Sequence, residues 1–306
     1  MKNGIHYVSY NHIDKIKWDR CIQESSNGIV FAYSWYLDSV IDNWDALILN
    51  DYEAVFPITK KTKWGLNYFF NPIFALQLGV FSKNKISDEL INKFISSIPK
   101  KIKLIDIQLN FENRFEDKSF EISKKACQFI ELNRSYSDIS KKYSTNLKRN
   151  LTKARKHNLE IVLSVDAENV IKLFKDNRGE TLKEMKEEQY QRLHSLLNQL
   201  KQRKLGKIYE CWLENELIAS ACFSITNNRI IYIKGGSNQK GRELGAMHLI
   251  MDEVIHLNSN SNLIFDFGGS SIDQVARFNR GFGAEDYEYQ RLYRNNLPYF
   301  IKMLKK

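Results

Sequence analysis

Two glycine pairs, each at the end of an apolar run, are the residues whose types and spacing could do chemistry. The run RIIYIK ends at Gly235 and Gly236, and the run LIFDF ends at Gly268 and Gly269, followed by Ser270. Glycine lets a backbone approach a ligand closely, so a strand that ends in this way can present N–H groups to one. One pair alone is typical of an ordinary turn. Two pairs flanking one helical segment favour a site.

Asp266 lies within the second run, between Phe265 and Phe267. Because side chains alternate between the two faces of a strand, Asp266 is expected to point away from both rings. Its carboxylate could take a proton from an attacking amine, or it could accept hydrogen bonds from the glycine loop that follows. Both interpretations stay open from the sequence. The chain has no G-x-S-x-G motif, P-loop or dinucleotide fingerprint.

The composition narrows the class of protein. The chain has 306 residues and a formal net charge of +10. This charge favours anionic partners such as phosphates, nucleic acid or an acidic membrane surface, although a soluble protein from a Lys-rich proteome would share it. Four scattered cysteines form no CxxC pair, so we expect no metal site and no disulfides. The segment MKNGIHYVSYNH lacks the apolar region of a signal peptide, and no apolar run reaches the ~20 residues that span a bilayer. We therefore expect a cytoplasmic protein that could touch a membrane surface.

Basic residues gather in one segment, YSTNLKRNLTKARKHNLEI. Apolar residues spaced by three or four predict a single helix over 137–157 with one apolar face. The opposite face carries Lys148, Arg149 and Lys153 and no acidic residue between 141 and 157. Such a face attracts phosphate-bearing ligands, and it is equally typical of a solvated basic helix. We take these three residues as candidate anion ligands.

The elements that must position these residues mix helices and strands in both halves of the chain. The first half has β-rich runs DALILN, AVFPI, LNYFF and LQLGVF, which the sequence predicts as an antiparallel meander. The second half predicts a helix, a strand, two helices, a three-strand meander over 207–236, a helix, the strand LIFDF, a short helix and a last strand near 287–293. The length favours two domains, 1–135 and 136–306.

The order and spacing of these motifs resemble the GNAT acyltransferase superfamily, most of all its FemAB-type branch with two GNAT-like halves. The resemblance depends on the basic helix with Tyr143, Asn146 and Lys148, and on YIKGGS, FDFGG and RFNRGFGA in this order. It covers roughly the last 170 residues well. The implied fold class is α/β (α+β), with a mixed, mostly antiparallel twisted sheet and helices on both faces in each half.

The resemblance implies an N-acyltransferase in which an amine attacks the donor carbonyl directly. The carbonyl would lie where two parallel strands splay apart, so that unpaired backbone N–H groups polarise it. No cofactor is held permanently; the donor would be acyl-CoA or aminoacyl-tRNA. The implied donor-binding residues are Tyr232, Gly235, Gly236, Arg242, Gly245, Gly268, Gly269, Ser270 and Phe278. The implied partners are a small-molecule or cell-wall-precursor amine bound in a cleft between the halves, and possibly tRNA.

Two positions depart from the family pattern. Acyl-CoA users carry an Arg/Gln-x-x-Gly-x-Gly/Ala loop, which Arg242 and Gly245 match, but Met247 replaces the small residue. FemAB-type proteins commonly have Phe-Lys where this chain has Phe278-Asn279. Arg280 or Arg277 could supply the missing positive charge, although a guanidinium group differs in geometry from the ammonium of a Lys. We therefore name Asp266, Asn279 and Arg280 as catalytic candidates, with a non-catalytic protein that binds an anionic polymer such as tRNA as the alternative.

Overall fold

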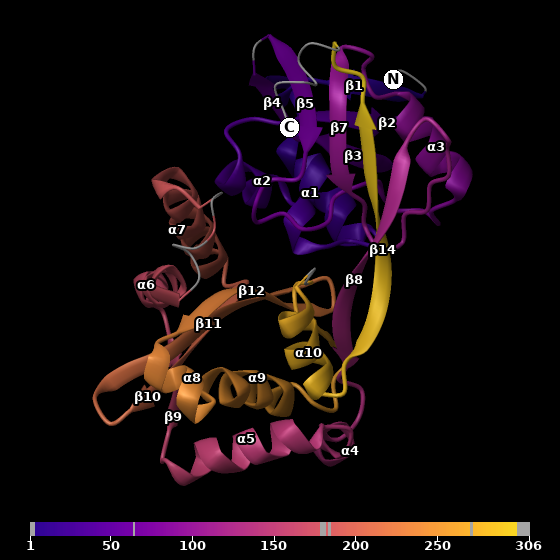
Figure 1. Cartoon of the computed structure of the whole chain (residues 1–306). Helices are drawn as coiled ribbons and strands as arrows, with labels where there is room; N and C mark the ends of the chain where they lie inside the picture. The colour runs from indigo at the N-terminus through magenta and orange to yellow at the C-terminus, as the bar shows by residue number, and fades with distance from the viewer. Residues whose placement is uncertain (1–3, 64, 178–181, 183–184, 270–271, 299–306) are drawn as a thin grey trace. The chain divides into compact units, whose positions relative to one another are not determined.

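The computed structural model describes residues 4–63, 65–177, 182, 185–269 and 272–298, and these form two compact units. Unit 1 consists of Met1–Lys125 with Glu288–Lys306, and unit 2 is Ala126–Tyr287. The sequence placed the boundary at residue 135 and assigned everything after it to one half. In the structure the chain passes from one unit to the other within β8 (Glu121–Glu131) and returns within β14 (Glu285–Asn295) (Figure 1).

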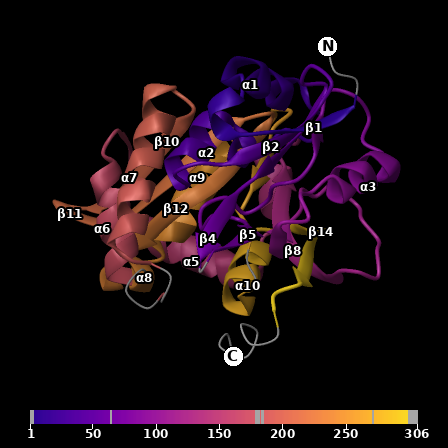
Figure 2. The ribbon, with the colours of Figure 1, turned by 90° about the horizontal axis from the view of Figure 1, so that it is seen from above.

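Unit 1 contains two groups of strands. Strands β1, β2, β3 and β6 form an antiparallel sheet, whereas β5 joins β7 in parallel and β14 lies antiparallel to β7. Figure 2 shows α1 and α2 side by side. The elements are β1 (Ile5–Val8), η1 (Tyr10–His12), α1 (Lys15–Glu24), η2 (Val30–Ala32), α2 (Ser34–Val40), β2 (Asp45–Leu49), β3 (Ala54–Ile58), β4 (Lys60–Lys63), β5 (Leu66–Phe70), β6 (Phe81–Ser82), α3 (Asp88–Ser96) and β7 (Ile102–Gln108).

The single antiparallel meander expected in this unit is wrong in two respects. LNYFF forms β5, which pairs with β7 in parallel rather than with the preceding runs β2 and β3. The run LQLGVF is irregular up to Val80 apart from one bridge at Leu78, and only its last residue, Phe81, enters a strand, β6, which pairs antiparallel with β3. Gly79 in this run has a φ of +144°. The side-chain oxygen of Asn113 accepts a hydrogen bond from the N–H of Val80 at 2.7 Å. A side-chain hydrogen bond from a distant loop therefore replaces the strand ladder.

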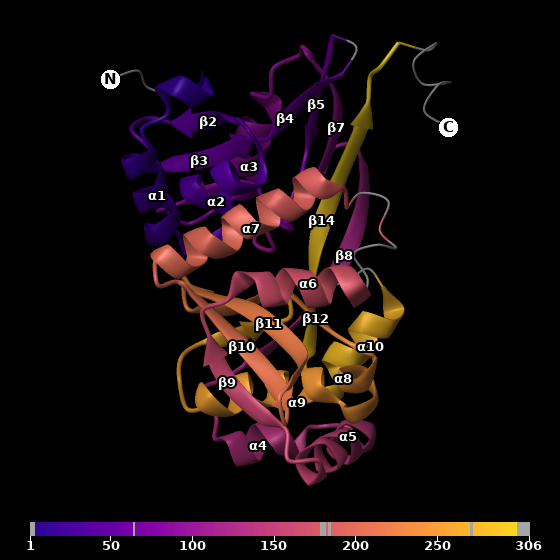
Figure 3. The ribbon, with the colours of Figure 1, turned by 90° about the vertical axis from the view of Figure 1, so that its left-hand side faces the viewer.

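Unit 2 contains a sheet with the strand order β8-β13-β12-β11-β10-β9. All neighbouring strands in it are antiparallel except β12 and β13, which are parallel. Helix α9 packs on one face and α6 on the other (Figure 3). The elements are α4 (Tyr136–Lys141), α5 (Thr145–Lys156), β9 (Glu160–Ser164), α6 (Ala167–Asn177), α7 (Glu187–Gln202), β10 (Gly206–Leu213), β11 (Glu216–Thr226), β12 (Arg229–Ser237), α8 (Gln239–Leu244), α9 (Ala246–Leu257), β13 (Ile264–Asp266) and α10 (Asp273–Gly281).

The core of unit 2 lies between the sheet and the helices α5 and α9. Phe223, Phe265 and Phe282 are fully buried there, with Leu147 and Leu151 of α5 packed against the same cluster. Each Phe buried in this way stabilises the fold by about 1.5–3 kcal/mol. The apolar spacing that predicted the basic helix therefore marks the face that α5 buries.

The expected helix over 137–157 is two helices. The side chain of Ser144 accepts a hydrogen bond from the N–H of Leu147 and caps α5, while the N–H of Ser144 donates to the carbonyl of Gly281. A serine cap at this point starts a new helix instead of continuing α4.

The turn at Asn227 and Asn228 is confirmed, because both residues have positive φ and join β11 to β12.

Candidate functional site

The parallel strands β12 and β13 diverge after three residues. Their pairing covers Arg229–Ile231 of β12, and β12 then continues to Ser237 beside β11 alone among the described strands. A bulge in β12 adds one residue, Ile233, between the partners of Cys222 and Phe223. A bulge bends its strand and disrupts the ladder locally. The structure thus contains the splay that the resemblance implied, at the start of the YIKGGS motif.

Gly268 holds the second strand at the splay. Its φ is +75°, and a Cβ atom there would lie 2.5 Å from the carbonyl oxygen of Tyr232. Only glycine allows β13 to leave β12 by this path. Gly269 has a similar φ of +74°, and Ser270 lies outside the described residues.

Gly235 and Gly236 serve packing within the sheet. A Cβ on Gly235 would lie 2.6 Å from the carbonyl oxygen of Ser220, and one on Gly236 would lie 2.3 Å from that of Leu173 in α6. The close approach that these glycines allow is therefore to β11 and to α6. Contact of either glycine with a donor stays a prediction.

A cavity of about 310 Å³ lies at the splay. Tyr232, Phe267 and Phe278 contribute aromatic walls, and the amides of Asn177, Gln274 and Asn279 are polar points in an otherwise apolar lining with Met247, Met251 and Val275. Burial raises the pKa of Tyr232 far above its ordinary value, so the phenol stays neutral. Three of the predicted site residues, Tyr232, Phe278 and Asn279, line this one cavity, and their contact with a donor stays a prediction.

The helix α9 begins beside this cavity. Gly245 is its N-cap with a φ of +75°, and no side chain caps the helix. The first turn of a helix has N–H groups without intrahelical partners and a positive dipole end, which suit an anion. Arg242 donates to the carbonyl of Ser237 at 2.9 Å and to Asn177 at 3.3 Å. Met247 lines the cavity, so a bulky side chain stands at the place where the family pattern has a small one.

A second cavity, of about 720 Å³, adjoins the first and shares Gln274 and Phe278 with it. Helices α5, α9 and α10 line it. Its polar residues are Ser144, Asn146, Asn150, His248, Gln274, Arg277 and Arg280. Two guanidinium groups line it, of which that of Arg280 also pairs with Asp286, and such groups fit a phosphate-bearing ligand.

His248 is a site residue that sequence reasoning missed. Burial lowers its pKa to about 4, so the ring is neutral near pH 7. The ring lies 4.7 Å from that of Phe278, and its Nε2 lies 3.4 Å from the side-chain nitrogen of Asn150. The sequence showed only a pair of histidines eight residues apart on one helix. No signal in that spacing indicates that one of them lines a cavity.

Asn279 and Arg280 belong to one chain of hydrogen bonds. Asn279, which is 2% exposed, donates to the side-chain oxygen of Gln128 at 2.9 Å, and Gln128 donates to Asp286 at 2.7 Å. Arg280 pairs with the same Asp286 at 2.9 Å. Partial burial acts to raise the pKa of Asp286, but the hydrogen bonds from Arg280 and Gln128 outweigh it and hold that pKa below its ordinary value. Gln128 was missed because β8 carries mostly polar residues and was not recognised as a strand.

Asp266 lies on the opposite side of β13 from Phe265 and Phe267, whose rings contact each other in the core. It is 2% exposed, and its carboxylate accepts four hydrogen bonds. The donors are the thiol of Cys127, the N–H of Gly268, Arg229 and Tyr287. These bonds fix the end of β13, which favours the structural interpretation. Proton transfer to Asp266 stays a prediction.

Lys234 is a second residue that sequence reasoning missed. It follows the bulge in β12, and its Nζ lies 4.5 Å above the ring of Phe174 in α6. Burial lowers its pKa to about 8, so a substantial fraction is uncharged in mildly alkaline solution. Lysines with such a pKa occur at functional sites more often than elsewhere.

The candidate anion ligands lie on the exposed face of α5. Lys148, Arg149 and Lys153 line a shallow pocket of about 400 Å³ with Lys156 and two threonines. The Nζ of Lys153 donates to the carbonyl of Glu243, the residue before the last of α8, at 2.8 Å. The cationic face of α5 therefore reaches the segment that leads into α9.

The comparisons with known proteins agree with this geometry. Residues 141–291 match the family model of the acetyltransferase (GNAT) domain. These residues are a GNAT domain. The GNAT assignment made from the motifs is confirmed, and with it the chain is an acyltransferase by family. No curated protein sequence matches the chain at a significant level.

Solved structures extend the fold of this GNAT chain beyond the matched domain. The crystal structure of FemX has a TM-score of 0.70 and 12% identity, covering 98% of this chain and 100% of FemX. The structure of L-PGS from Bacillus licheniformis has a TM-score of 0.55 and 12% identity, covering 95% of this chain and 95% of L-PGS. A tandem GNAT protein from the clavulanic acid biosynthesis pathway has a TM-score of 0.51 and 10% identity, covering 94% of this chain and 97% of that protein. Identities this low show the fold alone, and they confirm the expected fold class with two GNAT-like halves.

No helix in the described part of the chain combines the length and the apolar character needed to cross a bilayer. Likewise, the described residues include no group of His, Cys, Asp and Glu side chains placed to hold a metal ion.

Proposed function

We propose that this GNAT protein is an N-acyltransferase that binds an acyl-CoA at the splay of β12 and β13. The observation that carries the proposal is the position of the apolar cavity at the splay, directly beside the uncapped N-terminus of α9 and a second, cationic cavity. An acyl-CoA needs this combination, because its apolar thioester arm and its phosphates must be held at the same time.

The reaction follows from the geometry of the splay. The amine nitrogen attacks the thioester carbonyl, and the carbonyl oxygen gains negative charge. Backbone N–H groups of β12 beyond Ile231 have no partner strand on the β13 side among the described strands, and they would stabilise that charge. The C–S bond then breaks, the CoA thiolate leaves, and the amine proton passes to solvent or to the thiolate. Positioning and electrostatics supply the catalysis, so no covalent intermediate is needed.

Individual residues have separate parts in the proposal. Asn279 lines the cavity and is oriented by Gln128. Arg277 and Arg280 bind donor phosphates from the second cavity. Asp266 keeps β13 in place through its four donors, so it is a positioning residue. The acceptor is an amine of a small molecule or of a cell-wall precursor.

A thiol-release assay tests the proposal. Acetyl-CoA and longer acyl-CoAs are offered with a panel of amines that includes amino sugars, amino acids and peptidoglycan precursors. We expect thiol release that depends on one class of amine. Arg277→Ala should raise the KM for acyl-CoA about tenfold with little change in kcat, because a phosphate contact removed from ground and transition state alike changes binding alone. Arg203→Ala, on the exposed end of α7, is the matched control.

Aminoacyl-tRNA is the second donor to test, since the cationic face of α5 would suit a polyanion. Transfer from aminoacyl-tRNA without any from acyl-CoA would refute the donor and keep the reaction. Tight tRNA binding with no transfer from either donor would refute the enzyme and support the non-catalytic alternative.

A further inference from the structure

Strand β9 forms one edge of the sheet in unit 2. Among the described strands, β10 is its only neighbour. Three apolar residues along it are exposed: Val162 by 40%, Leu163 by 65% and Val165, just beyond the strand, by 68%. Edge strands of soluble proteins usually carry charged residues or proline, which block pairing with another chain. β9 has neither between Ile161 and Val165, so its edge is open to an added strand.

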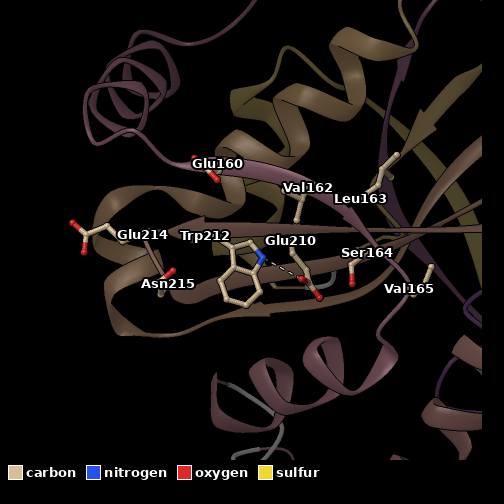
Figure 4. A pocket seen from close by; sticks show the side chains of 9 residues that line it. All are labelled: Glu160, Val162, Leu163, Ser164, Val165, Glu210, Trp212, Glu214 and Asn215. Carbon is tan, nitrogen blue, oxygen red and sulfur yellow. Dashed lines mark hydrogen bonds between the residues drawn. The ribbon is translucent and has the colours of Figure 1, made fainter.

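A groove of about 570 Å³ lies over β9 and β10 (Figure 4). Its lining contains three carboxylates and no Lys, Arg or His, although the whole chain has a net charge of +10. The lining residues are Glu160, Val162, Leu163, Ser164, Val165, Glu210, Trp212, Glu214 and Asn215. The groove is therefore a local acidic and apolar surface on a basic protein.

Glu210 places a buried carboxylate at the groove. The residue is 3% exposed, and its carboxylate accepts hydrogen bonds from Asn169 at 2.9 Å and from the indole N–H of Trp212 at 3.1 Å. Both of these donors are neutral. A buried carboxylate is normally paired with a cation, because its desolvation is costly. A cationic group entering the groove would meet both this carboxylate and the indole ring beside it.

We propose that β9 and this groove bind an extended, cationic segment of a partner protein. The segment adds to the sheet as a strand beside β9 and places a Lys or Arg side chain against Glu210 and Trp212. Strands lie about 4.8 Å apart, so an added strand would lie roughly 10 Å from β10, within reach of a long side chain that crosses Val162. A second copy of this chain fits poorly, since it would bring Glu160, Glu210 and Glu214 against themselves.

This surface is separate from acyl transfer, because the groove shares no lining residue with the cavities at the splay. A defined peptide tests it. The probe is a fluorescein-labelled nonapeptide, Thr-Val-Thr-Val-Arg-Val-Thr-Val-Thr, with blocked ends, and binding to the full chain is measured by fluorescence anisotropy. Two matched peptides carry Gln in place of Arg, or N-methyl groups on alternate amides. We expect each change to weaken binding at least about tenfold, since one removes the charge pair and the other the strand ladder.

Variants of the protein complete the test. Val162→Lys changes an exposed side chain and should weaken binding of the Arg peptide about tenfold by charge repulsion and by blocking the edge, with acyl transfer unchanged. Glu210→Gln should remove the preference for Arg over Gln, and Glu116→Gln, an exposed carboxylate in unit 1, should change nothing.

Three results would overturn the proposal. The first is no binding of any of the peptides, and the second is equal binding of the Arg peptide and its N-methylated form. The third is a dimer in sedimentation that Val162→Lys dissociates, which would make a second copy the occupant.

Discussion

His248 shows how burial decides the chemistry of one residue. In the unfolded chain its imidazole titrates near the ordinary value of 6.5, but in the folded chain burial lowers the pKa to about 4. Near neutral pH the ring is therefore neutral and cannot act as a phosphate-binding cation in the second cavity. In the proposed function, Arg277 and Arg280 are the phosphate-binding cations of this cavity.

The same shift predicts a pH dependence of stability. Between about pH 4 and 6.5 the unfolded chain binds more protons at this residue than the folded chain, so the free energy of unfolding rises with pH in that window. His248→Phe keeps a ring beside Phe278 and removes the titration. We expect wild type to lose roughly 2 kcal/mol more stability than this variant between pH 7 and pH 4. Urea unfolding at both pH values measures the difference, and equal losses would contradict it.

Asn279 and Gln128 predict a coupled pair. Asn279→Ala leaves the buried oxygen of Gln128 without this donor, and we expect a loss of about 1–3 kcal/mol in unfolding free energy. Gln128→Ala removes the same bond, so the double variant should lose less than the sum of the single variants, with a coupling of about 1 kcal/mol. Additive losses in this double-mutant cycle would show that the bond does not contribute. Because Asn279 also lines the splay cavity, kcat is measured in the same variants.

At the scale of elements, the glycines of β12 set how closely the layers of unit 2 approach. A Cβ atom added to Gly236 would lie only 2.3 Å from the carbonyl oxygen of Leu173, so no side chain fits there unless α6 moves. The sheet and the helix that covers it are therefore fixed together at the end of β12, a few residues beyond Tyr232 of the proposed donor cavity.

Gly236→Ala should therefore destabilise the protein by more than about 2 kcal/mol, because the added methyl group overpacks the contact between β12 and α6. Gly65→Ala is the control: its φ is +71° and nothing lies within 4 Å of its Cβ position, so only backbone strain of about 1–2 kcal/mol is expected. Thermal unfolding of both variants measures the losses. A smaller loss for Gly236→Ala would mean that α6 adjusts easily.

The elements also show why sequence periodicity was informative to different degrees. The meander β10, β11 and β12, the turn at Asn227, and α10 are local patterns, and each was predicted. The break at Ser144 was missed because a serine within an apolar repeat can be either a cap or a helix interior residue. β8 was missed because only its neighbours in the sheet, and no local pattern, make a run such as EISKKACQFIE a strand.

At the scale of the whole molecule, the net charge of +10 predicts how the affinity for each donor depends on salt concentration. Binding of acyl-CoA, which neutralises few phosphates, should weaken only modestly between about 50 and 200 mM salt, whereas binding of aminoacyl-tRNA along α5 should weaken by orders of magnitude, because each neutralised phosphate contributes to the salt dependence. Calorimetry at several salt concentrations measures both slopes. A steep slope for acyl-CoA would indicate that its phosphates contact more cations than the second cavity offers.

The sequence by itself determined the strand and helix order of residues 207–293, the glycines at the splay and the cationic face of α5, since these depend on local pattern and residue type. Only the tertiary structure decided that Asp266 is held by four donors, that Gln128 orients Asn279 and that Gly236 faces α6. It also buried much of His248 and Lys234, and this partial loss of hydration lowers their pKa values. Each of these depends on residues far apart in the chain, and the packing that joins them leaves no periodic signal in the sequence.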